Sequence, residues 1–121
     1  MVFSMTPRIG ALLALLLLAG CASGDPAPTA QLKITEQALA QARAVGASGE
    51  QASLRQAETG LDAARKAFQR QRYRKARLFA ERAELDARLA EAQALSGKDR
   101  ARLAELKADV ERLRGELRDL Q

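Results

Sequence analysis

Alanine and leucine recur at alternating spacings of three and four residues through the second half of this 121-residue chain. That spacing places apolar side chains on one face of an α-helix. An alanine stripe consists of Ala76, Ala80, Ala83, Ala87, Ala90 and Ala94. A leucine seam follows and consists of Leu103, Leu106, Val110, Leu113, Leu117 and Leu120. The pattern predicts an all-α protein whose long C-terminal helix ends in a coiled-coil-like seam.

Breaks in the periodicity divide the chain into three predicted helices, at about 30–45, 50–70 and 74–120. Gly46 and Gly49 end the first helix. The third helix continues through Gly97, because the heptad phase of the leucines is unchanged across it. No Gly or Pro marks residues 70–74, so a single rod from Glu50 onward is the alternative to a turn there. Like-charged neighbours around residue 70 weaken a continuous helix and favour the turn. We therefore expect an antiparallel helical hairpin within a three-helix arrangement.

The third predicted helix also carries a second apolar face. Leu78, Leu85 and Leu89 lie about 200° around the helix from the alanine stripe. A helix with two apolar faces is expected between two partners. The predicted helices at 30–45 and 50–70 are the candidates to cover them.

Composition limits the chemistry available to the chain. It has no histidine and one cysteine, which excludes metal sites built on histidine and nucleophile–histidine catalytic pairs. The sequence pattern does not indicate a pocket that would hold two carboxylates together. We expect a non-enzymatic protein with no metal and no cofactor other than covalent lipid.

The N-terminal segment is typical of a secretory signal peptide over residues 1–20. Arg8 precedes an apolar run that is too short to span a bilayer, which needs about 20 residues. Leu18-Ala19-Gly20-Cys21 resembles the lipobox of bacterial lipoproteins at all four positions. The resemblance implies cleavage between Gly20 and Cys21, followed by attachment of diacylglycerol and an N-acyl chain such as palmitate to Cys21. Two or more chains anchor a protein firmly where one does not.

The expected mature chain begins at Cys21 and is organised as a tether and a helical domain. Residues 21–29 contain Pro26 and Pro28 and form a flexible tether, and residues 30–121 form the helical domain. By the same resemblance, the absence of Asp after Cys21 favours the outer membrane, with the protein facing the periplasm.

A basic patch spans the expected second turn, and it contains Arg65, Lys66, Arg70, Arg72, Arg74, Lys75 and Arg77. One interpretation is a solvated turn. The other is contact with anionic headgroups or peptidoglycan, because the second helix returns the chain toward the lipid. Nucleic acid is excluded as a partner by export. The leucine seam either packs on the second helix or, since the third helix is longer, overhangs to hold a second copy or an envelope protein.

Three segments resemble bacterial lipoproteins of domain-of-unknown-function family 4398. They are ALAQARAVGA (38–47), AARKAFQRQRYRKA (63–76) and ARLFAERAELDARLAEA (76–92). The family pattern places Tyr73 ahead of Ala76, Ala80 and Ala83. The resemblance implies an alanine-rich helical hairpin without catalytic residues. We predict a periplasm-facing lipoprotein with an envelope-structural or adaptor role, the alternative being a non-covalent tether to peptidoglycan or another anionic surface through residues 65–77.

Overall fold

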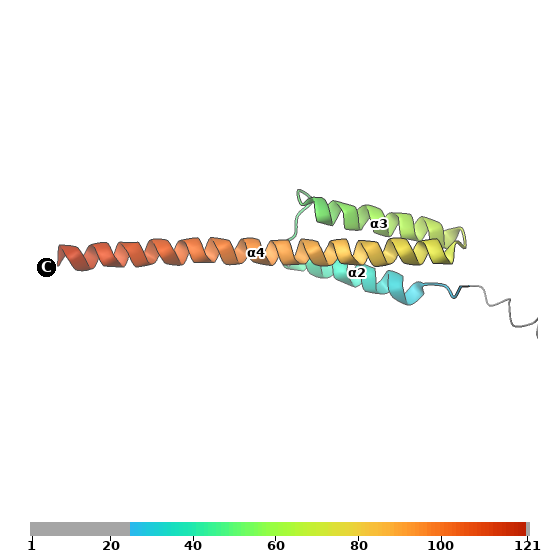
Figure 1. Cartoon of the computed structure of the whole chain (residues 1–121), viewed down its shortest axis with the longest axis horizontal. Helices are drawn as coiled ribbons and strands as arrows, with labels where there is room; N and C mark the ends of the chain where they lie inside the picture. The colour runs from blue at the N-terminus through green and yellow to red at the C-terminus, as the bar shows by residue number, and fades with distance from the viewer. Residues whose placement is uncertain (1–24, 121) are drawn as a thin grey trace, which may run out of the picture.

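The computed structural model describes residues 25–120, so the predicted signal peptide, the lipidation site at Cys21 and the terminal Gln121 lie outside it. Three helices form within this range: α2 (Thr29–Ala44), α3 (Ala52–Gln69) and α4 (Tyr73–Asp119). Figure 1 shows α3 running back along α2 and α4 running back along α3. The predicted three-helix arrangement with a long C-terminal helix is confirmed, and the chain turns before Tyr73 instead of forming a single rod from Glu50.

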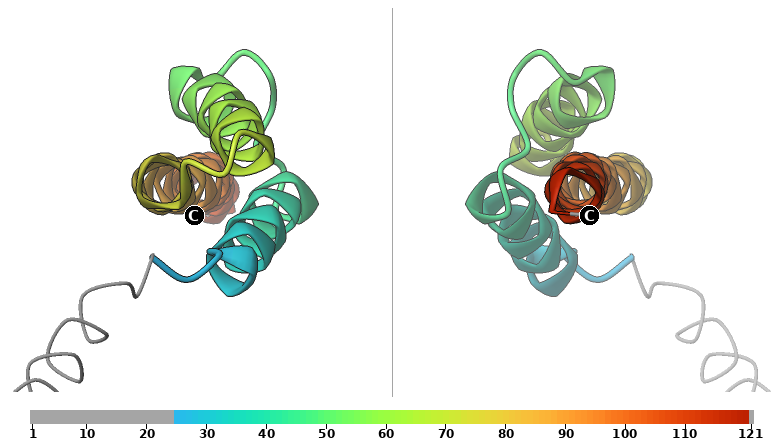
Figure 2. Two further views of the ribbon diagram at one scale, coloured as in Figure 1. Left: turned by 90° about the vertical axis from the view of Figure 1, so that its right-hand side faces the viewer. Right: turned by 90° about the vertical axis from the view of Figure 1, so that its left-hand side faces the viewer.

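The alanine stripe of α4 is the centre of the core. Five of its six residues are fully buried and Ala94 is 8% exposed. Both α2 and α3 pack against α4, and the end-on views show them on one side of it (Figure 2). Leu39 of α2 and Leu54 and Leu61 of α3 are the large apolar side chains of this core. We call this part of the molecule, residues 25–94, the body.

The second apolar face of α4 is not covered, contrary to the expectation from sequence. Leu78, Leu85 and Leu89 are 59%, 67% and 49% exposed. The physical reason is the small size of alanine, which lets α2 and α3 share one narrow face of α4 instead of taking opposite faces. None of the helices within residues 25–120 has an apolar stretch long enough to cross a bilayer.

The helix α3 approaches α4 closely at Gly60. A Cβ atom added to Gly60 would lie 2.9 Å from the Cβ of Ala83, which is shorter than an ordinary contact. Glycine at this position therefore sets the distance between the two helices.

Buried hydroxyl groups connect the helices and fix their register. The fully buried Thr35 of α2 has its Oγ1 2.9 Å from the carbonyl oxygens of both Gln31 and Ala80. Its single proton is donated to one of them at a time. In α3, the Ser53 hydroxyl lies 2.6 Å from Oε1 of Gln93 in α4. These contacts align both shorter helices with the first half of α4.

The two connections use the same helix-ending hydrogen bonds with different residues. After α2, the amides of Gly46 and Ala47 donate to the carbonyls of Arg43 and Ala42, and Gly46 has a φ of +99°. After α3, the amides at 71 and 72 donate to the carbonyls at 68 and 67 in the same pattern, and Gln71 has a φ of +58°. Both are Schellman motifs, and the second has glutamine at the left-handed position that glycine usually occupies.

Candidate functional site

The basic patch lies at one end of the body, over the end of α3, the connection and the start of α4. We call this end the basic tip. Two of its residues are neutralised locally: Arg65 pairs with Glu36 of α2 at 2.7 Å, and Lys66 pairs with Asp62 at 2.6 Å. No carboxylate within residues 25–120 forms an ion pair with the other five, which are Arg70, Arg72, Arg74, Lys75 and Arg77. The uncompensated charge is therefore concentrated at the connection and the first turns of α4.

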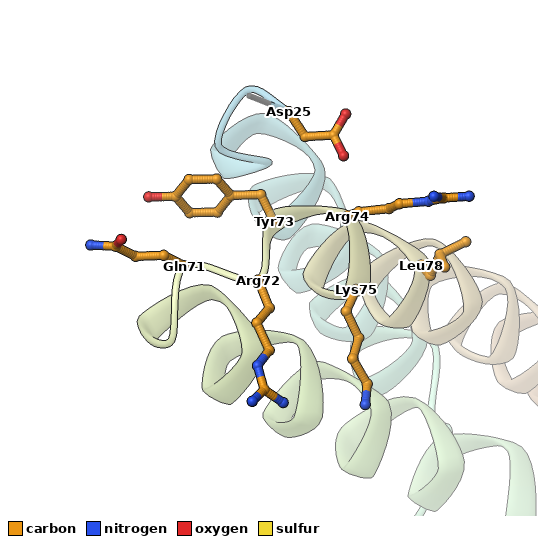
Figure 3. Close-up of a pocket in the computed structure, with 7 residues that line it drawn as sticks. All are labelled: Asp25, Gln71, Arg72, Tyr73, Arg74, Lys75 and Leu78. Atoms are coloured by element: carbon orange, nitrogen blue, oxygen red, sulfur yellow. The ribbon is translucent and has the colours of Figure 1, made fainter. Parts of the chain in front are cut away.

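The basic side chains fan out around the tip instead of converging on one point. In Figure 3, Arg74 extends to the side where Asp25 and Leu78 lie, whereas Arg72 and Lys75 extend in another direction. An open hollow of about 760 Å³ lies among Asp25, Leu78 and the residues of the connection. This arrangement does not enclose a small anion, and it suits contact with an extended anionic surface.

A smaller hollow of about 210 Å³ lies between α3 and α4 on the other side of the tip. Four basic residues line it, namely Lys66, Arg70, Arg72 and Lys75. Its apolar lining includes Phe79, and the ammonium of Lys75 lies 5.6 Å from the centre of that ring. This cation–π contact joins two residues one turn apart in α4. Sequence reasoning missed Phe79, although its spacing of four residues from Lys75 on one predicted helix is a signal that could have identified the contact.

The end of the predicted tether lies against the basic tip. Arg77 Nη2 donates a hydrogen bond of 3.1 Å to the carbonyl of Pro26, and Pro28 is buried at the start of α2. The described chain therefore begins beside residues 70–77. Cys21 is four residues before Asp25, a separation that an extended chain spans in at most about 14 Å. Sequence reasoning placed the patch on the tether side but did not identify Pro26 as a contact.

The leucine seam lies at the opposite end of the molecule. Figure 1 shows α4 continuing alone beyond α2 and α3, and we call residues 95–120 the overhang. The six seam residues are 45–83% exposed. The seam does not pack on α3, so within one chain its apolar surface faces water.

Four surface ion pairs lie within the described part of the body. Arg43 of α2 pairs with Glu58 of α3 at 2.6 Å, which connects the two shorter helices. Hydrogen bonds from Arg88 and then Gln31 lower the pKa of Glu84 below its ordinary value, and partial burial opposes them. No group of three or more metal-ligating residues occurs within residues 25–120. Within the described residues, the two ends of the molecule differ in character: one carries the basic tip and the other the exposed leucine seam.

Residues 30–106 match the sequence profile of a family described as Domain of unknown function (DUF4398). The chain is also similar to a crystal structure of a DUF4398 family protein from Pseudomonas aeruginosa PAO1. The sequence identity is 48% and the TM-score is 0.77, and the match covers 79% of this chain and 100% of that one. No curated protein matches significantly.

Proposed function

The chain belongs to the DUF4398 family, and from its geometry we propose that it is a non-enzymatic, lipid-anchored spacer of the bacterial envelope. In this proposal acylated Cys21 holds the protein on the outer membrane, facing the periplasm. The overhang of α4 then presents the leucine seam to a partner at a distance from the bilayer. The role is that of an adaptor or structural component.

The observation that carries this proposal is that the tether end and the leucine seam lie at opposite ends of the molecule. The tether end, with Pro26 against Arg77, lies at the first turn of α4, and the seam lies at its last turns. The 47 residues of α4 span about 70 Å at 1.5 Å per residue. A chain anchored at Cys21 would therefore have its apolar seam far from the anchor. The lipobox at Leu18–Cys21 supports the anchor itself.

The anchor is tested by expressing the full chain in a Gram-negative host and measuring the mass of its N-terminal peptide. We expect Cys21 as the first residue, carrying a diacylglycerol and an N-acyl chain, in material recovered with the outer membrane. A Cys21→Ala chain is the matched control and should incorporate no labelled fatty acid. An N-terminal peptide that contains Cys21 without acyl mass would contradict the proposal.

A second candidate function is contact between the basic tip and an anionic surface, either lipid headgroups or peptidoglycan. It is favoured by the five basic residues that no carboxylate in the described chain neutralises, and by the four residues of sequence that separate Asp25 from Cys21. Each Lys or Arg near an anionic membrane contributes about 1 kcal/mol, and the effect falls off within a Debye length of about 8 Å. Export makes nucleic acid an unsuitable partner for the same charge.

The contact is tested with a chain that starts at Ala22, so that lipid does not contribute. Replacing all seven basic-patch residues by Gln should abolish sedimentation with anionic vesicles, with purified cell wall, or with both. The matched control replaces seven basic residues of the overhang, which are Lys98, Arg100, Arg102, Lys107, Arg112, Arg114 and Arg118. It removes the same charge and should retain binding. Equal losses in both variants would mean that net charge, not the tip, determines binding.

A further inference from the structure

The uncovered face of α4 follows one heptad register from the body to the end of the overhang. Leu78, Leu85 and Leu89 lie in the same register as the leucine seam. Small or polar residues occupy the register positions between Leu89 and the seam, and these are Ala92, Ser96 and Asp99. From Leu103 to Leu120 every position of the register is Leu or Val, and none of these six residues is covered within the described chain. The continuous run of large apolar side chains therefore begins after Asp99 and extends to the last described turn of the helix.

We propose that a second copy of this chain covers the leucine seam, in a parallel, in-register coiled coil over residues 103–120. The proposal identifies the partner of the adaptor surface in the proposed function, and it rests on that function only for the shared membrane. In an in-register pair each seam residue meets its own equivalent. Leu106 and Leu113 then alternate with Leu103, Val110 and Leu117 to form the apolar layers typical of such coils.

Charges beside the seam favour the parallel orientation. Arg100, Lys107 and Arg114 flank one side, and Arg102, Asp109 and Glu116 flank the other. In a parallel pair, Asp109 of each copy meets Arg114 of the other, which offsets the like-charge contact between Arg102 and Lys107.

An antiparallel pair that overlays the six seam residues has no such compensation. It brings Lys107 next to Arg114 of the second copy, and Asp109 next to Glu116 of the second copy. Both contacts join like charges and each occurs twice, so all of these flanking pairs are repulsive. A parallel partner identical to this chain is therefore the better electrostatic match.

The body does not obstruct this pairing. Figure 2 shows α2 and α3 on one side of α4, and the exposed Leu85 and Leu89 mark the side that they leave open. In a parallel pair the two basic tips and the two tether ends lie at the same end. Two copies anchored at Cys21 in one membrane therefore meet in the orientation that the charges favour.

Disulfide crosslinking of the full chain in cells tests the proposal, because Cys21 is the only natural cysteine. Leu106→Cys lies in the seam, and Ala108→Cys is the matched control on the opposite face of the same helical turn. Both residues are exposed in one chain, so neither substitution disturbs the body. We expect a covalent dimer with an added oxidant for L106C, and none for A108C or the parent chain.

Each other outcome overturns the proposal. A monomer with L106C, or equal crosslinking of L106C and A108C, excludes a specific seam dimer. A dimer formed only when L106C and L117C chains are expressed together indicates the antiparallel arrangement. A crosslink to another protein means that the seam holds a different partner. These results are independent of the acyl mass at Cys21, so failure of the lipid anchor is distinguished from failure of the dimer.

Two charge reversals in the detergent-solubilised full chain should change the dissociation constant of the dimer in opposite directions if the dimer is parallel. Arg114→Glu places like charges at both Asp109 contacts and should weaken self-association roughly tenfold. Arg102→Glu replaces the repulsion at Lys107 by attraction and should strengthen it by a similar factor. In the antiparallel arrangement R114E would instead face Lys107 and strengthen association. Tighter association of R114E would therefore contradict the parallel pair.

Discussion

The two halves of α4 share one helical register but differ in which face is buried. In the body, the alanine face is covered by α2 and α3, while the leucines on the other face are exposed. In the overhang, neither face is covered within the chain. The small-residue face continues through Gly97, Ala101 and Ala104, yet no helix packs on it there. The lesson is that the lengths of α2 and α3, not the pattern of α4, determine where the body ends.

The two faces of α4 differ in the size of their side chains. Alanine and Gly60 let α3 approach α4 closely, because they present little or no side chain between the two helices. Leucine instead needs a partner surface with gaps between side chains of similar size. The alanine face is thus suited to the packing of α2 and α3, and the leucine face has the side-chain sizes that the proposed dimer requires.

The largest expected difference between the two halves comes from one substitution made in each. Ala87→Leu inserts a large side chain where the alanine is fully buried, and we expect the free energy of unfolding to fall by about 2–3 kcal/mol. Ala108→Leu occupies the same face three heptads later, where the residue is exposed, and should change stability by less than about 0.5 kcal/mol. Urea unfolding followed by circular dichroism measures both. Equal effects would show that the alanine face is not the core.

Glycine-to-alanine substitutions should change the free energy of unfolding in opposite directions in the body and in the overhang. Gly60→Ala creates the 2.9 Å contact with Ala83 and should destabilise the protein by about 1–2 kcal/mol, after the gain in helix propensity is subtracted. Gly97→Ala meets no atom within 4 Å and should stabilise it by about 0.5–1 kcal/mol. The midpoints of thermal unfolding report both signs. Stabilisation by G60A would mean that α3 and α4 separate readily.

The buried hydroxyl of Thr35 is expected to make a smaller contribution, specific to the body. Thr35→Val keeps the shape of the side chain but removes its hydrogen bond, at a cost of about 1 kcal/mol. Thr59 also donates to a backbone carbonyl, at 2.8 Å, but it is exposed. Thr59→Val is therefore the control and should be close to neutral in the same unfolding measurement. A neutral T35V would show that packing alone fixes α2 on α4.

The smallest expected effect is the pH dependence from Glu84. Hydrogen bonds from Arg88 and Gln31 lower the pKa of Glu84 in the folded state below its ordinary value of 4.5. The resulting stabilisation is present above the unfolded pKa and is lost as the pH falls through the lowered folded pKa. Glu84→Gln should therefore make the free energy of unfolding less dependent on pH below 4.5. The substitution should not change the stability of the overhang. If the free energies of unfolding of the parent and the variant changed in parallel as the pH was lowered below 4.5, this role of Glu84 would be contradicted.

Much of the fold was predictable because helical periodicity and helix breaks are local properties of the sequence. The alanine stripe and the continuation through Gly97 follow directly from spacing, and both are confirmed. The turn at Gln71 was ambiguous, because a left-handed glutamine costs about 1–2 kcal/mol and has no sequence signature. The exposure of Leu85 and Leu89 was mispredicted, because the pattern alone does not assign helices to faces.

The sequence predicted which residues form the candidate surfaces, but not whether those residues are exposed or paired in the folded protein. The seam residues are recognisable from their heptad spacing, whereas their exposure depends on the short length of α3. The pattern of charges did not reveal that Arg65 is paired with Glu36, since those residues lie far apart in the sequence. The contact between Arg77 and Pro26 also depends on tertiary structure. Contacts of this kind can be identified only from the folded structure.

The length of α4 has a practical consequence for the hydrodynamics of the protein. A compact domain of about 100 residues has a radius of gyration near 13 Å, whereas this helix alone spans about 70 Å. Friction on an elongated particle makes a monomer elute from a sizing column like a heavier globular protein. Elution volume alone would therefore mimic self-association. Light scattering or sedimentation equilibrium, which report mass independently of shape, are the appropriate measurements of its stoichiometry.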